Sequence, residues 1–172
     1  PTEVAIQGNA KSHPAVQNLS QTIATRAESH FRALELVEPE LSVVLCDNQV
    51  IHELNKAWRG EDKPTDVLSF PLHQFDAPGQ FQRGNSPLDP AAFGGIALGD
   101  IVISVEYATA LAQTREHQRR VAQELGVPAT ELEWSVEREV YFLLIHGLLH
   151  LVGHDHITAQ QEQRMKAEER RL

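Results

Sequence analysis

The spacing of apolar residues changes along the chain, and these changes outline its secondary structure. Alternating or β-branched apolar runs predict strands, whereas apolar residues repeated every three or four positions predict helices. The predicted strands cover residues 2–6, 41–46, 67–71 and 96–104. The predicted helices cover residues 15–36, about 48–58, 104 or 105 to about 125, a long apolar run through 134–144, and a charged run after 158. Together they predict an α+β fold, a single domain over residues 1–172 with a roughly four-stranded mixed sheet and packed helices.

Residues that favour helix ends locate several of these boundaries. Asp47 or Asn48 is expected to cap the second helix, and Gly126 to end the third. Residues 130–133 match a capping box, which predicts that the long apolar helix begins there. Thr158 is expected to cap the last helix.

One segment has no usable period. Residues 75–95 are rich in Pro, Gly, Gln and Asn. A segment of this length and composition in a compact domain predicts a long flexible loop, and a lid beside an active site is one role for it.

Composition and charge limit the cellular compartments and the binding partners that fit this protein. No apolar run is long enough to cross a bilayer, and no secretory signal is visible. The single cysteine, Cys46, has no partner for an internal disulfide, which predicts a reducing compartment and hence the cytoplasm. The formal net charge of −9 argues against nonspecific nucleic-acid binding but leaves a nuclease open.

Three histidines near the C-terminal end have the spacing of a metal site. They follow the pattern H-x-x-x-H-x-x-G-x-x-H, in which His146, His150 and His156 are the histidines and Gly153 is the glycine. Histidines four apart share one helix face, and Gly153 lets the chain turn so that His156 reaches the same ion. Three imidazoles with an open position are typical of a catalytic zinc site. We therefore expect one Zn²⁺ ion per chain, with other divalent metals as alternatives, on a zincin-like helix.

The same run differs from a metalloprotease at one position. Gly147 stands where those enzymes carry the glutamate that acts as general base, so this site lacks the protease's base. His154 is expected to face solvent or substrate. Asp155 is either an acceptor for a ligand N–H or a turn residue bonded to its own backbone.

Two further polar stretches are less specific. Residues 59–66 form a dense polar turn before a predicted strand, and charge density alone favours a solvated loop there. A basic cluster lies in the third helix, and such clusters are mostly solvated helix faces. Its members are Arg115, His117, Arg119 and Arg120.

The run from His146 to His156 resembles the signature of the YbeY family, H-G-x-L-H-L-x-G-x-D-H. Two further blocks of that family agree in the same order, residues 55–59 with 63–70 and residues 99–104. The resemblance spans most of the chain, although residues 75–95 and 114–132 look longer than usual for the family. Its members are bacterial single-strand-specific endoribonucleases that mature ribosomal RNA.

The resemblance implies a zinc-dependent endoribonuclease that acts on single-stranded RNA, including the 3′ end of 16S ribosomal RNA, and in ribosome assembly and quality control. It carries the three histidines over as zinc ligands and Arg59 as an arginine at phosphate. A metal-bound water would attack the phosphodiester. The general base stays open among Asp66, Asp155 and a second metal-bound water.

The resemblance also implies partners: the small ribosomal subunit, ribosomal proteins and an assembly GTPase, with no membrane. Two alternative functions remain. One is a non-catalytic ribosome-assembly factor in which zinc is structural. The other is a zinc peptidase or amidase that uses another carboxylate, such as Asp155, and Gly147 argues against it.

Overall fold

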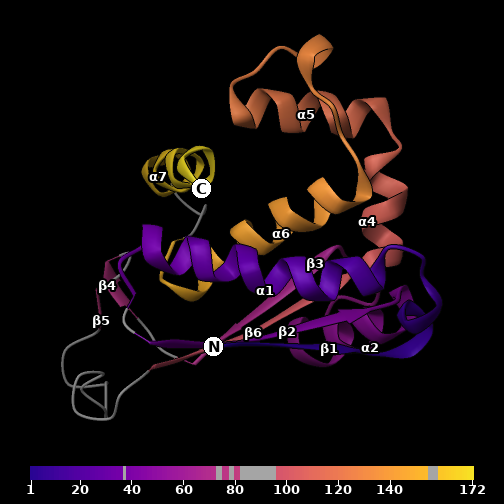
Figure 1. Ribbon diagram of the computed structural model, residues 1–172, viewed down its shortest axis with the longest axis horizontal. Coiled ribbons are helices and arrows are strands. Elements are labelled where there is room, and N and C mark those ends of the chain that lie inside the picture. The colour runs from indigo at the N-terminus through magenta and orange to yellow at the C-terminus, as the bar shows by residue number, and fades with distance from the viewer. Residues whose placement is uncertain (37, 73–74, 78–79, 82–95, 155–158) are drawn as a thin grey trace.

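A four-stranded mixed sheet in the order β1-β2-β6-β3 organises the computed structural model (Figure 1). The strands are β1 (Thr2–Ile6), β2 (Pro39–Cys46), β3 (Val67–Pro71) and β6 (Ile96–Ser104). β1, β2 and β6 run parallel, and β3 lies antiparallel to β6 at one edge. The structure describes residues 1–36, 38–72, 75–77, 80–81, 96–154 and 159–172. The predicted fold class and all four predicted strands are confirmed.

Two helices cover one face of the sheet and a third covers part of the other face. α1 (Val16–Ala33) and α6 (Val136–Leu151) pack on the first face, where the larger apolar core forms. α2 (Asn48–Arg59) packs on the second face over a small core of Cys46, Ile51, Leu68 and Val102. Side chains alternate along a strand, so β3 and β6 contribute to both cores.

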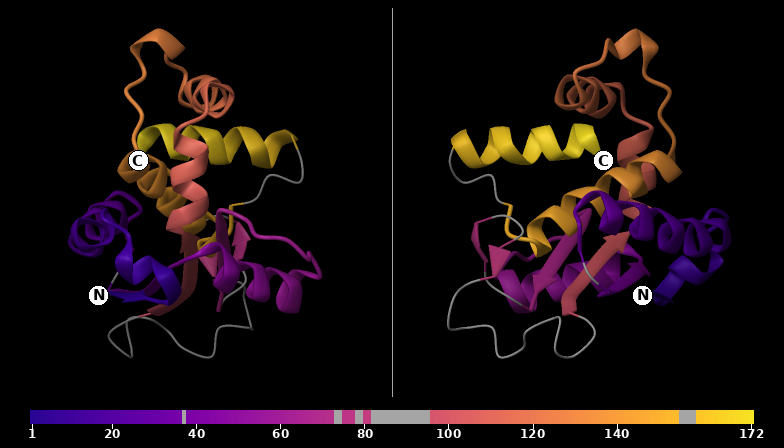
Figure 2. Two further views of the ribbon diagram at one scale, coloured as in Figure 1. Left: turned by 90° about the vertical axis from the view of Figure 1, so that its right-hand side faces the viewer. Right: turned by 60° about the vertical axis from the view of Figure 1, so that its left-hand side comes forward.

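The remaining elements extend the side of the sheet that carries α6. They are η1 (Gly8–Ser12), α4 (Val105–Ala112), α5 (Arg115–Leu125), η2 (Ala129–Glu131) and α7 (Ala159–Arg171). The short strands β4 (Phe75–Ala77) and β5 (Gln80–Phe81) pair with each other in a separate two-stranded sheet. Figure 2 shows α7 lying across α6, with α5 on the far side of α7 from the sheet. Within the described residues, no helix is long and apolar enough to span a membrane.

Two predicted helix boundaries are wrong. The predicted helix from 104 or 105 to 125 is two helices, because the Thr114 hydroxyl accepts a hydrogen bond from the His117 N–H and starts a new helix. The capping box at 130–133 does not begin the long helix, since Ser135 caps α6 by accepting from the Arg138 N–H. The predicted loop begins with paired strands β4 and β5, whereas residues 82–95 and the expected cap Thr158 lie outside the described residues.

Candidate metal centre

His146 and His150 lie one turn apart on α6, as their spacing predicts. The Nε2 atoms of the two rings are 3.3 Å apart, and the rings are inclined at 75°. Both side chains are half-buried, so both remain reachable. The two nitrogens therefore converge on one point.

The distance between these nitrogens fits a shared zinc ion. Nitrogens bound at the usual distance to a tetrahedral zinc are about 3.3 Å apart. Within the described residues no cluster of three or more His, Cys, Asp or Glu side chains is arranged to hold a metal. The predicted third ligand, His156, and the neighbouring Asp155 lie outside those residues, so the complete ligand set stays a prediction.

Glu169 of α7 reaches the other side of the His146 ring. Its Oε1 lies 3.1 Å from His146 Nδ1, and its side chain is only 4% exposed. An Nδ1–H that donates to this carboxylate directs the Nε2 lone pair away from Glu169. Sequence reasoning missed Glu169, although it follows the buried Met165 by one helical turn and therefore shares its inward face.

A second carboxylate from α5 lies near this pair. Burial, and then repulsion from the Glu169 charge, raises the pKa of Glu124. Lys166, His146 and His117 partly oppose that rise. Titratable side chains of α5, α6 and α7 therefore influence one another's charge next to the histidine pair.

Gly147 faces the sheet, which explains why no larger residue stands there. A Cβ atom at this position would lie 2.9 Å from Ile101 Cγ2 and 3.1 Å from Ser69 Oγ. Ser69 Oγ also donates a hydrogen bond to the Gly147 carbonyl at 3.4 Å. A glutamate at 147 would clash with β3 and β6, so the protease's base has no room.

Gly153 turns the chain away from α6, as predicted. Its φ is 102°, a value that residues with a Cβ rarely adopt. His154, however, does not face solvent, because it is 7% exposed and its Nδ1 has no hydrogen-bond partner among the described residues. Burial, together with the charge of Arg164, lowers the pKa of His154, and Glu168 and Glu169 oppose this.

Arg59 and Asp66 flank the turn that connects α2 to β3. Arg59 is the last residue of α2 and is exposed. Asp66 is half-buried, and its Oδ1 accepts hydrogen bonds from the Val67 N–H at 2.8 Å and the Thr65 hydroxyl at 3.3 Å. Oδ1 of Asp66 is therefore occupied by local hydrogen bonds.

The predicted basic cluster on α5 is not uniformly solvated. His117 turns inward, and its Nε2 lies 2.8 Å from Oε2 of the fully buried Glu139. Trp134 Nε1 donates to the same oxygen at 2.8 Å. Arg119 and Arg120 are exposed, as expected for a solvated face.

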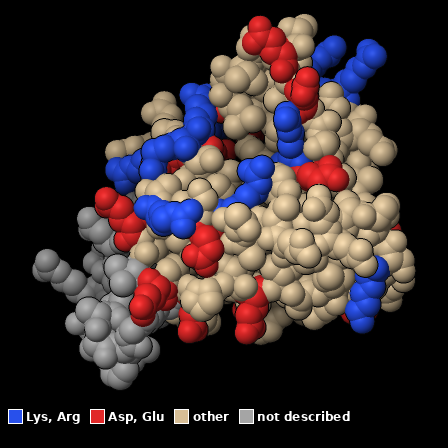
Figure 3. Space-filling model, in the orientation of Figure 1, with Lys and Arg blue, Asp and Glu red and all other residues tan. Residues whose placement is uncertain are grey.

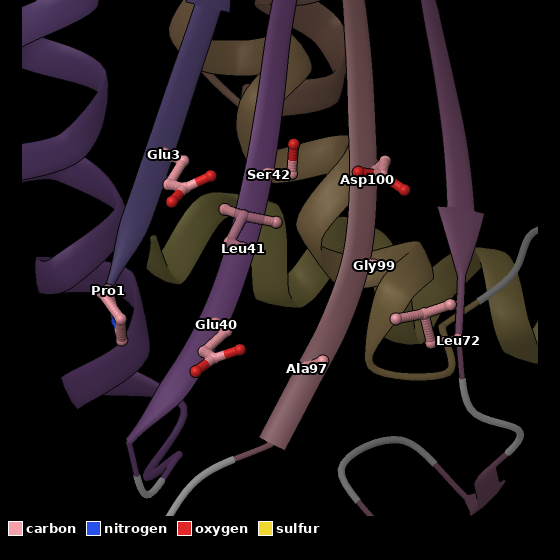
Figure 4. Close-up of a pocket in the computed structure, with 9 residues that line it drawn as sticks. All are labelled: Pro1, Glu3, Glu40, Leu41, Ser42, Leu72, Ala97, Gly99 and Asp100. Atoms are coloured by element: carbon pink, nitrogen blue, oxygen red, sulfur yellow. The ribbon is translucent and has the colours of Figure 1, made fainter.

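A pocket of about 300 Å³ lies on the sheet face opposite α6, at the end that α2 leaves open (Figure 4). Glu3, Ser42 and Asp100 lie in one row across β1, β2 and β6. Glu40 also lines the pocket. Its three carboxylates disfavour phosphate, so this pocket is a poor site for an RNA backbone.

Comparison with known proteins finds one family over nearly the whole chain. The family model described as Endoribonuclease YbeY matches residues 4–172. A protein of that name from Bacillus subtilis is 35% identical over 157 residues, which cover 91% of this chain and 81% of its own. The Persephonella marina protein of that name is 36% identical over 135 residues, 78% of this chain and 68% of its own. The solution structure of a Thermotoga maritima protein aligns with 97% of this chain and 87% of its own, with 22% identity and a TM-score of 0.49.

Proposed function

The chain belongs to the endoribonuclease YbeY family and is an endoribonuclease, and we propose that it cleaves single-stranded RNA at a zinc ion held by His146, His150 and His156. The observation that carries this proposal is the convergence of two Nε2 atoms 3.3 Å apart on α6. Neutral imidazoles are zinc ligands, and three of them leave a fourth position for chemistry.

The described residues each have a separate task in this mechanism. A zinc ion held by His146, His150 and His156 would supply a nucleophile at neutral pH and polarise a phosphoryl oxygen. Glu169 accepts the Nδ1–H of His146, which would direct the Nε2 lone pair of that ring toward the proposed ion. Gly147 keeps α6 close to β3 and β6, which fixes the height of both rings above the sheet.

Arg59 is proposed to bind the phosphate group. Its guanidinium can donate two parallel hydrogen bonds to phosphate oxygens and stabilise the charge that develops during cleavage. Figure 3 shows further Lys and Arg side chains over α7 and the adjoining end of α1, interspersed with Asp and Glu. These cations offset locally part of the repulsion that a net charge of −9 exerts on a polyanion.

The general base is left to Asp155 or a second water in this proposal. Asp66 is the weaker candidate, because its Oδ1 already accepts two hydrogen bonds. The packing of Gly147 against Ile101 also counts against a peptidase, since the glutamate base of such enzymes does not fit.

We further propose ribosomal RNA as the substrate, with the small ribosomal subunit, ribosomal proteins and an assembly GTPase as partners. The family resemblance is the ground for these proposals. A cytoplasmic location is proposed from Cys46, a buried free thiol that a reducing compartment preserves.

A paired assay of bound metal and RNA cleavage tests the mechanism. We expect His150→Ala to lose both zinc and cleavage, whereas Arg59→Ala keeps zinc and loses cleavage. Lys56→Ala, an exposed cation one turn earlier on α2, is the matched control and should keep both. Wild-type protein that binds zinc but cleaves no RNA, with or without ribosomes, would instead favour the non-catalytic assembly factor.

A further inference from the structure

Trp58 is an apolar residue that lies in the core-facing stripe of α2 but is left exposed. It follows Ile51 by seven positions and Leu54 by four, and such spacings share one helix face. Ile51 is fully buried and Leu54 is partly buried, yet Trp58 is 72% exposed. The stripe therefore continues past the small core, and its largest side chain faces solvent.

The indole of Trp58 is held on one side by Phe70 of β3. The two ring centroids are 6.2 Å apart and the rings are inclined at 71°. Phe70 itself packs against the small core beneath α2. Trp58 therefore stands on a helix and is supported by a strand, which gives a rigid aromatic surface that is open on its other side.

Trp58 and the histidine pair lie on opposite faces of the same edge strand. Ser69 and Phe70 are successive residues of β3, so their side chains point to opposite faces of the sheet. Phe70 contacts Trp58, and Ser69 Oγ donates to the carbonyl of Gly147, the residue after His146. β3 is an edge strand, and a chain that crosses this edge can reach both the metal helix and Trp58.

The segment around Trp58 has equal numbers of acidic side chains and of Lys and Arg, although the protein as a whole is acidic. Residues 52–63 contain three cations, Lys56, Arg59 and Lys63, and three acids, Glu53, Glu61 and Asp62. Glu61 pairs with Lys63 at 3.9 Å, and Asp62 with His52 at 2.7 Å. A protein with a net charge of −9 gains little from general attraction to phosphates, so contacts to the bases must supply more of its affinity.

We propose that Trp58 is a stacking platform for an unpaired base of the RNA substrate, next to the phosphate that Arg59 binds. Every base has a π-face, so stacking accepts different sequences but requires a base that is not paired within a duplex. The subsite thereby accounts for a preference for single-stranded RNA. It rests on the endoribonuclease function and does not depend on the metal.

Substitutions that separate aromatic from merely apolar character test the subsite. Trp58→Phe keeps a ring, Trp58→Leu keeps an apolar side chain, and Trp58→Ala keeps neither. Leu72→Ala removes another exposed apolar side chain, 62% exposed and directly after β3, and is the control. We expect Trp58→Ala and Trp58→Leu to weaken single-stranded RNA binding roughly 5- to 150-fold, while Trp58→Phe and Leu72→Ala stay within about threefold of wild type. Equal binding by the Leu and Phe variants overturns stacking.

An RNA oligonucleotide with one abasic site, moved along the strand, locates the base. At one position the abasic site should weaken binding to wild type but add no loss for Trp58→Ala, because both changes remove the same contact. If no such position exists, the proposal is overturned. It is also overturned if Trp58→Ala binds RNA as tightly as wild type, and Trp58 would then be assigned to contact with a protein partner. Binding is measured separately from cleavage. If the abasic site and Trp58→Ala show this non-additive loss of binding but the RNA is not cleaved, the proposed mechanism is refuted and the subsite stands. If the RNA is cleaved and its KM is unchanged in Trp58→Ala, the subsite is refuted and the mechanism stands.

Discussion

Glu169 Oε1 and His146 Nδ1 lie 3.1 Å apart, and this contact joins the C-terminal helix to the helix of the predicted zinc ligands. The other oxygen of Glu169 is buried without a hydrogen-bond partner among the described residues. A buried carboxylate is costly unless it is paired, so the His146 ring and α7 hold each other in place. The arrangement is typical of histidines that bind zinc through Nε2.

Glu169→Gln is therefore expected to weaken zinc binding roughly 10- to 100-fold. The amide keeps the size of the side chain but is a poorer acceptor for the Nδ1–H of His146. Competition with a chelator of known affinity measures the loss. Glu168→Gln is the matched control, because Glu168 pairs with Arg171 at 2.6 Å. Zinc affinity that falls equally in both variants would assign Glu169 to general stability of α7.

Gly147→Ala tests the close packing of α6 on the sheet. Here the substitution should lower the free energy of unfolding, whereas in an ordinary helix it raises it. In an ordinary helix interior, replacing Gly by Ala stabilises by roughly 1 kcal/mol. Here the new methyl group would lie 2.9 Å from Ile101 Cγ2, so overpacking should outweigh that gain and lower the free energy of unfolding by roughly 1 kcal/mol net. Gly147→Glu should lose more, because it also buries a charge. Urea unfolding measures both, and an alanine variant more stable than wild type contradicts the packing argument.

The order and type of the main elements followed from sequence because the apolar periods agree with the final burial. The core residues of α1, such as Leu19 and Ile23, repeat at helical spacing, and β6 reads as a buried strand. The division of residues 104–125 was missed because Thr114 competes locally with a helix pattern that otherwise continues through it. Such boundaries depend on one hydrogen bond, which a periodic pattern does not reveal.

The candidate site was only partly predictable for a different reason. His146 and His150 are local in sequence, so their spacing alone brings them together. Glu169 reaches His146 across 23 residues, and His117 reaches Glu139 across 22, through the packing of separate helices. His154 was expected to face solvent or substrate, yet its side chain is 7% exposed. Contacts that depend on tertiary packing have no periodic signal.

His117→Ala is expected to destabilise the protein by roughly 3 kcal/mol, because it leaves the carboxylate of Glu139 buried and underpaired. Trp134 would remain its donor. Pairing the change with Glu139→Gln should recover part of the loss, since the charge is removed as well. Denaturant unfolding of the two single variants and the double variant measures the coupling. Arg119→Ala, an exposed change on the same helix, should stay within about 0.5 kcal/mol of wild type, and an equal loss there would exclude a specific pair.

Asp47 makes the stability of α2 depend on pH. Its carboxylate accepts from the Asn9 N–H at 2.7 Å and the Val50 N–H at 2.9 Å, and these bonds hold the pKa of Asp47 below its usual value. A lowered carboxyl pKa means that the stabilisation is present at neutral pH and is lost as the pH falls from about 4 through the folded-state pKa. We expect Asp47→Ala to lower the free energy of unfolding at pH 7 by roughly 1–2 kcal/mol.

The pH dependence is best measured with Asp47→Asn, which removes the charge but keeps an acceptor. Wild type should be more stable than this variant at pH 7, and the difference should shrink steadily below pH 4 as the wild-type carboxyl is protonated. Glu53→Gln, a change at an exposed residue of the same helix, controls for net charge. Because α2 carries both Trp58 and Arg59, loss of its N-cap should also weaken RNA binding. A stability difference that is constant between pH 2 and pH 7 would show that the charge of Asp47 contributes nothing to the cap.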